Sequence, residues 1–176
     1  MLPSYQGELD GLCGPYAIAN ALKECGSLTQ EQKANIFKLA CETLSKRRWP
    51  EVLWEGTTFG DMQRMIRACL GNINHIQVRY PFVRSAPQSN DDYWEKFDSI
   101  FNDQSVMCGI IGLTKPSEHW IVVSRNGHRI DFTDSTAGQP YLRKNRRSLI
   151  AGLRRKKSSQ WLINRKELIV FLKRIR

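Results

Sequence analysis

The stretch Gln6-Gly-Glu-Leu-Asp-Gly-Leu-Cys13-Gly14-Pro15-Tyr16-Ala-Ile-Ala-Asn-Ala-Leu22 places a cysteine between a glycine-punctuated loop and a segment of small, apolar residues. Pro15 suits the first turn of a helix, because its missing N–H would have no partner there and its φ is already helical. Beyond it, apolar residues recur at helical spacing. The stretch therefore predicts a helix over residues 14–25 with Cys13 at its start.

The position of Cys13 favours a reactive thiol. Unpaired N–H groups at a helix start stabilise an anion, and the thiolate is the form of cysteine that attacks carbonyl carbons. Gly14 leaves no side chain beside the sulfur, so a substrate backbone can approach closely. The alternative is that Cys13 is a small buried hydrophobe, as most unpaired cysteines are. Taken alone, the residue supports both interpretations about equally.

A histidine and an aspartate occur on consecutive predicted strands near the end of the chain. His119 begins the β-branched run 119–123, and a second such run follows the Asn126-Gly127 dipeptide. Asn-Gly between two such runs predicts a β-hairpin. Alternation along the second strand places Asp134 on its apolar face and Asp131 on the opposite face. Asp134 is therefore the acid expected to orient His119.

Cys13, His119 and Asp134 are the parts of an activated nucleophile, in which the imidazole takes the thiol proton and the carboxylate fixes the imidazole tautomer. Gln6 can donate its side-chain amide to a developing oxyanion, together with the Cys13 N–H. Each residue has an ordinary alternative: a surface amide for Gln6, a hydrogen-bonded strand histidine for His119, and a turn residue for Asp134. The four residues in this order predict a catalytic site.

This pattern resembles the papain-like cysteine peptidase superfamily in its compact bacterial form, and is similar to the peptidases that process bacteriocins after a double glycine. The resemblance rests on Gln6, on Cys13-Gly14 at a helix start, on the run 119–123, and on Asp134-Ser135. It covers the two ends of the catalytic region and does not extend to residues 45–105. Six residues separate Gln6 from Cys13, where five are more usual in such enzymes.

The resemblance implies an α+β, papain-like fold in which an amino-terminal helical half carries the nucleophile and packs on an antiparallel sheet. It also implies a thiol hydrolase that needs neither cofactor nor metal. The chain length of 176 residues suits one such domain, over residues 1–176, with a strongly basic segment at 141–176. Helices are further expected over 29–46, from a cap at Thr57 or Thr58 to about residue 70, and over 91–101, the last capped by Asn90. Strands are expected over 74–82 and 106–113.

The basic segment is expected to be partly helical. Asn164 followed by Glu167 looks like a capping pair, and the apolar residues after it predict an amphipathic helix over 164–175. A short helix is expected over 148–153 and an edge strand over 159–163.

Five cysteines, at positions 13, 25, 41, 69 and 108, have wide spacings and no Cys-x-x-Cys pair, which argues against a disulfide framework or a zinc site. They predict a reducing compartment. Cys108, the rival nucleophile, lies inside an apolar run with no helix start beside it. No apolar run is long enough for a membrane helix and no signal sequence begins the chain, so we expect a cytoplasmic protein, which a specialised secretion system can deliver.

Charge is unevenly distributed along the chain. The formal net charge of +10 divides into −2 for residues 1–134 and +12 for residues 135–176. Two clusters hold most of the excess: Arg143, Lys144, Arg146 and Arg147, then Arg154, Arg155, Lys156 and Lys157. They predict capture of an acidic protein, ahead of nucleic acid, because no nucleic-acid-binding motif accompanies them. The alternative is a solvated basic face.

The sequence thus favours a cysteine peptidase that hydrolyses a peptide or isopeptide bond through a covalent acyl-enzyme. Glutamine deamidases and transglutaminases use the same machinery, so an effector of that kind is one alternative. A catalytically inactive, protease-like binding module is the other.

Overall fold

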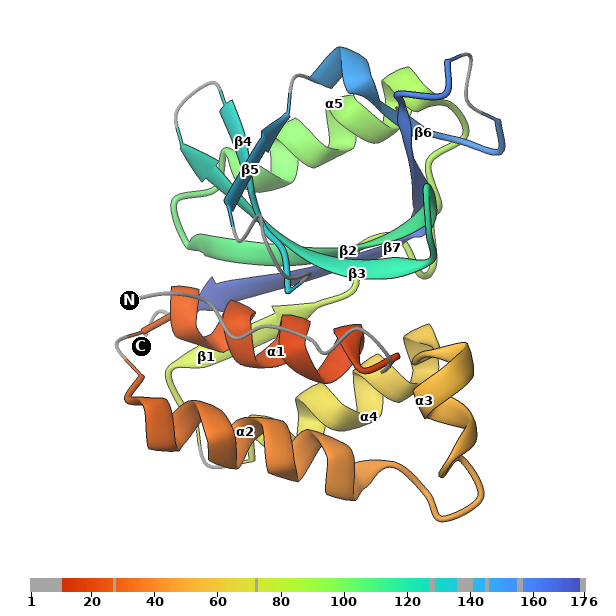
Figure 1. Ribbon diagram of the computed structural model, residues 1–176. Helices are drawn as coiled ribbons and strands as arrows, with labels where there is room; N and C mark the ends of the chain where they lie inside the picture. Colours follow the sequence, from red (N-terminus) through yellow and green to blue (C-terminus); the bar gives the residue numbers. More distant parts are fainter. Residues whose placement is uncertain are drawn as a thin grey trace.

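Helices cover both faces of one curved sheet in the computed structural model (Figure 1), which describes residues 11–26, 28–71, 73–126, 129–135, 141–144, 146–154 and 157–174. The elements in chain order are α1 (Cys13–Glu24), α2 (Gln30–Thr43), α3 (Glu51–Glu55), α4 (Phe59–Cys69), β1 (Ile76–Arg79), α5 (Asn90–Phe101), β2 (Val106–Lys115), β3 (His119–Asn126), β4 (Arg129–Thr133), β5 (Tyr141–Lys144), the 3₁₀ turn η1 (Arg146–Ser148), β6 (Leu149–Ala151) and β7 (Trp161–Lys173). The α+β class is confirmed.

The sheet is antiparallel along its main path, with the strand order β1-β7-β2-β3-β4-β5. Only β6 pairs in parallel, along the first residues of β7. The predicted hairpin is present: β3 and β4 pair antiparallel from Val122↔Thr133 to Asn126↔Arg129. Residues 127–128 of its turn lie outside the described residues.

Alternation along the central strands builds two cores, one on each face of the sheet. Ile110, Val122 and Ile169 face α1, α2 and α4 in the first core. Ile111, Val123 and Val170 face α5 in the second. Because β2, β3 and β7 are covered on both faces, each contains an unbroken apolar run, over 106–113, 120–123 and 168–172 respectively.

Side-chain caps fix the starts of three helices. Thr29 with Gln32 forms a capping box at α2, and Thr58 with Asp61 forms one at α4. The prediction that Asn90 caps α5 is wrong, because Ser89 accepts the N–H of Asp92 instead. The Asn90 side chain accepts the N–H of Ala151 at 2.9 Å and so ties α5 to β6.

The prediction for the basic end of the chain is wrong in its main element. Residues 164–173 continue β7 and form no helix, and 149–151 form the strand β6 where a short helix was expected. Leu168, Ile169, Val170, Phe171 and Leu172 are all buried, in the two cores alternately. β7 lies between β1 and β2 in the sheet, so the strand expected over 159–163 belongs to an interior strand and not to an edge strand.

No helix in the described part of the chain combines the length and the apolar character needed to cross a bilayer.

Candidate active site

Three elements bring the predicted catalytic residues together. Cys13 is the first residue of α1, His119 is the first residue of β3, and Asp134 directly follows β4. The register Val122↔Thr133 places Asp134 on the same face of the hairpin as His119, two positions along the strand. The register therefore agrees with the prediction that Asp134, and not Asp131, lies on the same face as His119.

His119 and Asp134 form a close, shielded pair. His119 Nε2 lies 2.7 Å from Asp134 Oδ1, and the two side chains are 11% and 9% exposed. Burial alone would lower the pKa of His119, but its hydrogen bonds to Asp134 and Cys13, with the electrostatic attraction of both groups, raise that pKa from 6.5 to about 9. The imidazole is therefore held in its charged form at neutral pH.

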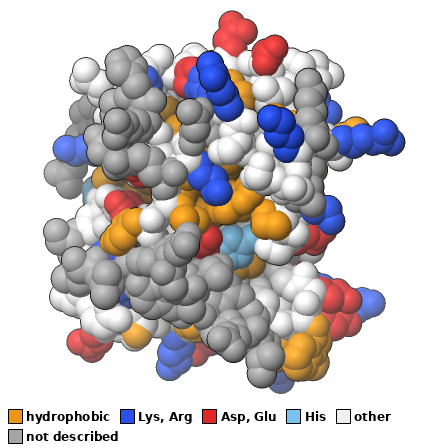
Figure 2. Space-filling view, turned by 45° about the horizontal axis from the view of Figure 1, so that its top comes forward, with side chains coloured by type: hydrophobic (Ala, Val, Ile, Leu, Met, Phe, Trp, Pro, Cys, Tyr) orange, Lys and Arg blue, Asp and Glu red, His pale blue; other side chains and the backbone are white. Residues whose placement is uncertain are grey.

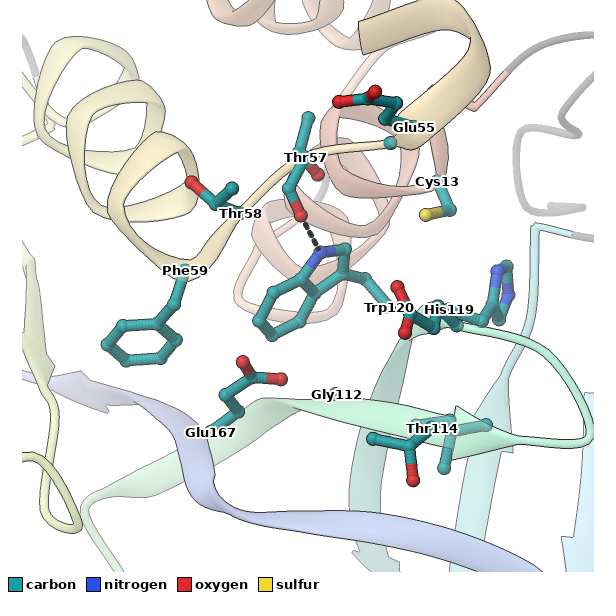
Figure 3. Close-up of a pocket in the computed structure, with 13 residues that line it drawn as sticks. Cys13, Glu55, Thr57, Thr58, Phe59, Gly112, Thr114, His119, Trp120 and Glu167 are labelled. Atoms are coloured by element: carbon teal, nitrogen blue, oxygen red, sulfur yellow. Dashed lines mark hydrogen bonds between the residues drawn. The ribbon is translucent and has the colours of Figure 1, made fainter.

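Cys13 faces a cavity that His119 also lines. The cysteine is only 5% exposed, yet it borders a space of about 250 Å³ between the helical layer and the sheet. Figure 3 shows its side chain, on α1, above the ring at the start of β3. Because Nε2 of His119 is engaged by Asp134, Nδ1 is the ring nitrogen left to exchange a proton with the thiol.

The start of α1 supplies an electropositive backbone. Leu12, at the N-cap, offers no side-chain hydrogen bond to the first turn, and no acidic residue lies in that turn. The N–H groups of a first helical turn have no partner within the helix, so their partial positive charge favours an anion at this end. The Cys13 N–H is the first of these groups in α1. Gln6, its predicted companion, lies outside the described residues.

Gly14 has a packing role in addition to the one expected from the sequence. A Cβ at this position would lie 2.1 Å from Thr57 Oγ1 and 2.8 Å from Met62 Sδ. The glycine therefore lets α1 pack against the segment that begins α4. Trp120, which follows His119, donates its indole N–H to the Thr57 carbonyl at 2.9 Å and fixes the same segment to the sheet.

The cavity also has residues that the sequence analysis did not single out as functional. Three of them are acidic: Glu55 from α3, Glu118 from the turn before β3, and Glu167 from β7. Glu167 was assigned to a helix, so no sequence signal could place it beside Cys13. The aromatic rings of Phe59 and Trp120 line the same space.

Cys108 is excluded as the nucleophile of this site. Its side chain is fully buried in β2, with Sγ 3.6 Å from Cys25 Sγ, and hydrogen bonding to Cys25 together with burial raises the pKa of its thiol well above the ordinary value. Within the residues that the structure describes, no group of His, Cys, Asp and Glu side chains has the arrangement of a metal site.

The predicted basic clusters lie away from the cavity. Lys144 stacks 4.0 Å from the centre of the Trp161 ring, and Arg146 lies over Trp94 and pairs with Asp98. Arg147, Arg154 and Lys157 are exposed. Figure 2, with the α5 side of the molecule tipped forward, shows Lys and Arg side chains spread over the upper half of that face. Arg155 and Lys156 lie outside the described residues, as does the side chain of Arg143.

No protein-family model, curated protein or solved structure matches the chain. The function of this site is therefore inferred from its own geometry.

Proposed function

We propose that this chain is a papain-like cysteine peptidase that hydrolyses a peptide or isopeptide bond through Cys13, His119 and Asp134. The observation that carries the proposal is the position of His119. Its ring is held by Asp134 at 2.7 Å, it lines the same cavity as the thiol of Cys13, and both groups raise its pKa. A thiol at a helix start, paired with an oriented imidazole, is the arrangement that activates cysteine for attack on a carbonyl.

The first half of the reaction forms an acyl-enzyme. His119 takes the proton of Cys13 before the substrate binds, as its raised pKa favours, and the sulfur then forms a bond to the scissile carbonyl carbon, whose oxygen becomes an oxyanion. The Cys13 N–H, with the side-chain amide of Gln6 as the predicted second donor, stabilises that oxyanion. His119 then gives its proton to the amide nitrogen, the C–N bond breaks, and the amine product leaves.

The second half regenerates the thiol. His119 takes a proton from water while the water oxygen attacks the thioester carbon, and the C–S bond breaks as the carboxylic acid product forms. The proton on His119 returns to sulfur. Asp134 keeps the ring in position throughout and stabilises its charged form, and it does not itself accept the proton.

A thiol-reactive probe tests this proposal directly. At low concentration, a biotinylated iodoacetamide should label Cys13 stoichiometrically, and His119→Ala should slow that labelling by about 100-fold, within the range typical of a lost acid–base partner. The site of labelling is read by peptide mass spectrometry. The matched control is His75→Ala, which removes an exposed histidine before β1. Equal labelling of all five cysteines, or labelling of Cys13 that ignores His119, would overturn the proposal.

The kind of acyl transfer is distinguished by the products. Mass spectrometry of candidate proteins after incubation separates chain cleavage from the mass gain of side-chain deamidation and from cross-linking. A peptidase gives cleaved chains. Deamidated or cross-linked products would show instead that a glutamine side chain is the acyl donor on the same catalytic residues.

The basic surface of the carboxy-terminal segment supports a second part of the proposal, namely that this face captures an acidic protein. Arg154 and Lys157 are exposed there, in a segment of net charge +12. Such a field raises the local concentration of an acidic partner near the catalytic domain.

A further inference from the structure

The cavity beside Cys13 is acidic although the protein as a whole is basic. Three glutamates, Glu55, Glu118 and Glu167, are among the described residues that line it, and none of those lining residues is a lysine or arginine. The three come from different elements and converge on one space. A substrate chain that enters this cavity therefore meets carboxylates on several sides.

Glu167 is the most constrained of the three. It is half-buried in β7, and burial with the nearby charge of Glu118 raises the pKa of its carboxyl group, against a hydrogen bond from Asn164. Across from it, a Cβ at position 112 would lie 2.0 Å from Glu167 Oε2, so glycine in β2 leaves the room that this carboxylate occupies. In Figure 3 the carboxylate points from β7 toward the side of the cavity formed by Phe59 and Trp120.

A buried carboxylate at the start of α4 is paired with arginines. Asp61, at 1% exposure, forms ion pairs with Arg48 and Arg64. Those arginines and the hydrogen bonds from Thr58 lower the pKa of Asp61 in spite of its burial. Glu167 has no ion pair with any described lysine or arginine. A half-buried carboxylate without a counter-charge is destabilising, unless a ligand supplies the charge.

The surroundings of Glu167 also suit the rest of a cationic side chain. Phe59 and Trp120 line the same cavity with ring centroids 6.1 Å apart. The methylene stem of a lysine or arginine packs on aromatic rings while its charged end reaches a carboxylate, and a guanidinium also stacks on ring faces.

We propose that Glu167, supported by Glu118, makes this site selective for substrates that carry a lysine or arginine side chain next to the scissile bond. The inference rests on the proposed thiol chemistry at Cys13 and goes beyond it by naming the substrate class. Glu167 acts here as a specificity residue: it binds the substrate and has no part in the bond-making steps.

Peptides in which a Michael acceptor replaces the scissile amide test this specificity. The set carries either arginine or citrulline, its neutral isostere, at each of the three positions on either side of the acceptor. The second-order rate of Cys13 alkylation is measured by mass spectrometry. At one position, arginine should raise this rate about tenfold over citrulline, as expected for a charge-assisted hydrogen bond in a shielded site.

Glu167→Gln should remove that advantage, so that the arginine and citrulline peptides react at equal rates. Glu95→Gln, which neutralises an exposed glutamate on α5, should keep the advantage and serves as the matched control. Equal arginine and citrulline rates with His119-dependent labelling would overturn the specificity alone. An arginine advantage that survives Glu167→Gln would do the same. Cys13 that no probe labels, or that reacts without His119, would overturn the thiol chemistry as well.

Discussion

At the scale of single residues, the charge of His119 depends on its burial and on its contacts with two neighbouring side chains. The ring is shielded from water, which disfavours the imidazolium, yet contacts with Asp134 and Cys13 raise its pKa to about 9. Asp134 and Cys13 together thus raise the pKa of His119 by more than burial lowers it. A peptidase of this kind is expected to rest as a charged pair at neutral pH, with the proton already on the ring that delivers it to the leaving group.

Replacing Asp134 by asparagine removes the larger of the two stabilising contacts while burial remains. In Asp134→Asn the pKa of His119 should therefore fall from about 9 toward or below 6.5. Titration of the ring signals by NMR measures the change. Asp131→Asn, on the opposite face of β4, is the control and should leave the His119 titration in place. A His119 pKa that stays near 9 in Asp134→Asn would contradict the role given to Asp134.

The same shift makes folding stability depend on pH. Because the folded-state pKa of His119 lies above its ordinary value, the wild-type protein gains stability from this group that is fully present below about pH 6.5 and is lost as pH rises through about 9. As pH rises from about 6.5 to about 9, the difference in unfolding free energy between the wild type and Asp134→Asn should therefore become smaller.

At the scale of elements, Cys13 is positioned by the close packing of α1 on the segment that leads into α4. Gly14 contacts Thr57 and Met62, the Gly11 N–H donates to the Leu53 carbonyl at 2.8 Å, and Trp120 donates to Thr57. These contacts join the helix start to the sheet that carries His119. The distance between thiol and imidazole therefore depends on glycine at position 14.

Gly14→Ala should lower the unfolding free energy by about 1–3 kcal/mol, as overpacking of a tight contact does, and should slow labelling of Cys13. Urea denaturation measures the first effect. In a Thr57→Ala background the loss should be smaller, because the nearest atom, Thr57 Oγ1, is gone. Gly26→Ala, where an added Cβ meets nothing within 4 Å, is the control and should be nearly neutral. Equal losses at positions 14 and 26 would refute the packing argument.

The sequence predicted those elements whose signals are local. The start of α1, the capping threonine of α4 and the β3–β4 hairpin each depend on a few adjacent residues, and all are present. β7 was missed because burial on both faces removes the alternation that identifies a strand. A continuous apolar run next to a capping-like Asn164 then imitates a helix. Glu167 was lost with it, since its place opposite Gly112 follows from strand pairing.

At the scale of the whole molecule, two charged regions lie apart. Glutamates line the cavity between the α1 layer and the sheet, whereas arginines and lysines gather around β5, β6 and α5. A substrate protein with an acidic surface and a cationic side chain at its scissile bond would complement both. We expect the basic surface to govern capture of such a substrate and the acidic cavity to govern selection of the bond.

Separate roles for the two regions predict separate effects of mutation. Arg154→Ser with Lys157→Ser should weaken binding to polyglutamate severalfold, with an affinity that falls steeply as salt rises, and should leave alkylation of Cys13 by a short neutral probe unchanged. Lys38→Ser with Lys46→Ser removes the same charge from exposed positions on and after α2 and should bind polyglutamate like the wild type. Fluorescence anisotropy measures binding. An equal loss of polyglutamate binding in both double variants would show that the net charge of the protein, and not the basic surface, attracts the acidic partner. Tighter binding to single-stranded RNA than to polyglutamate would make nucleic acid the partner of this face.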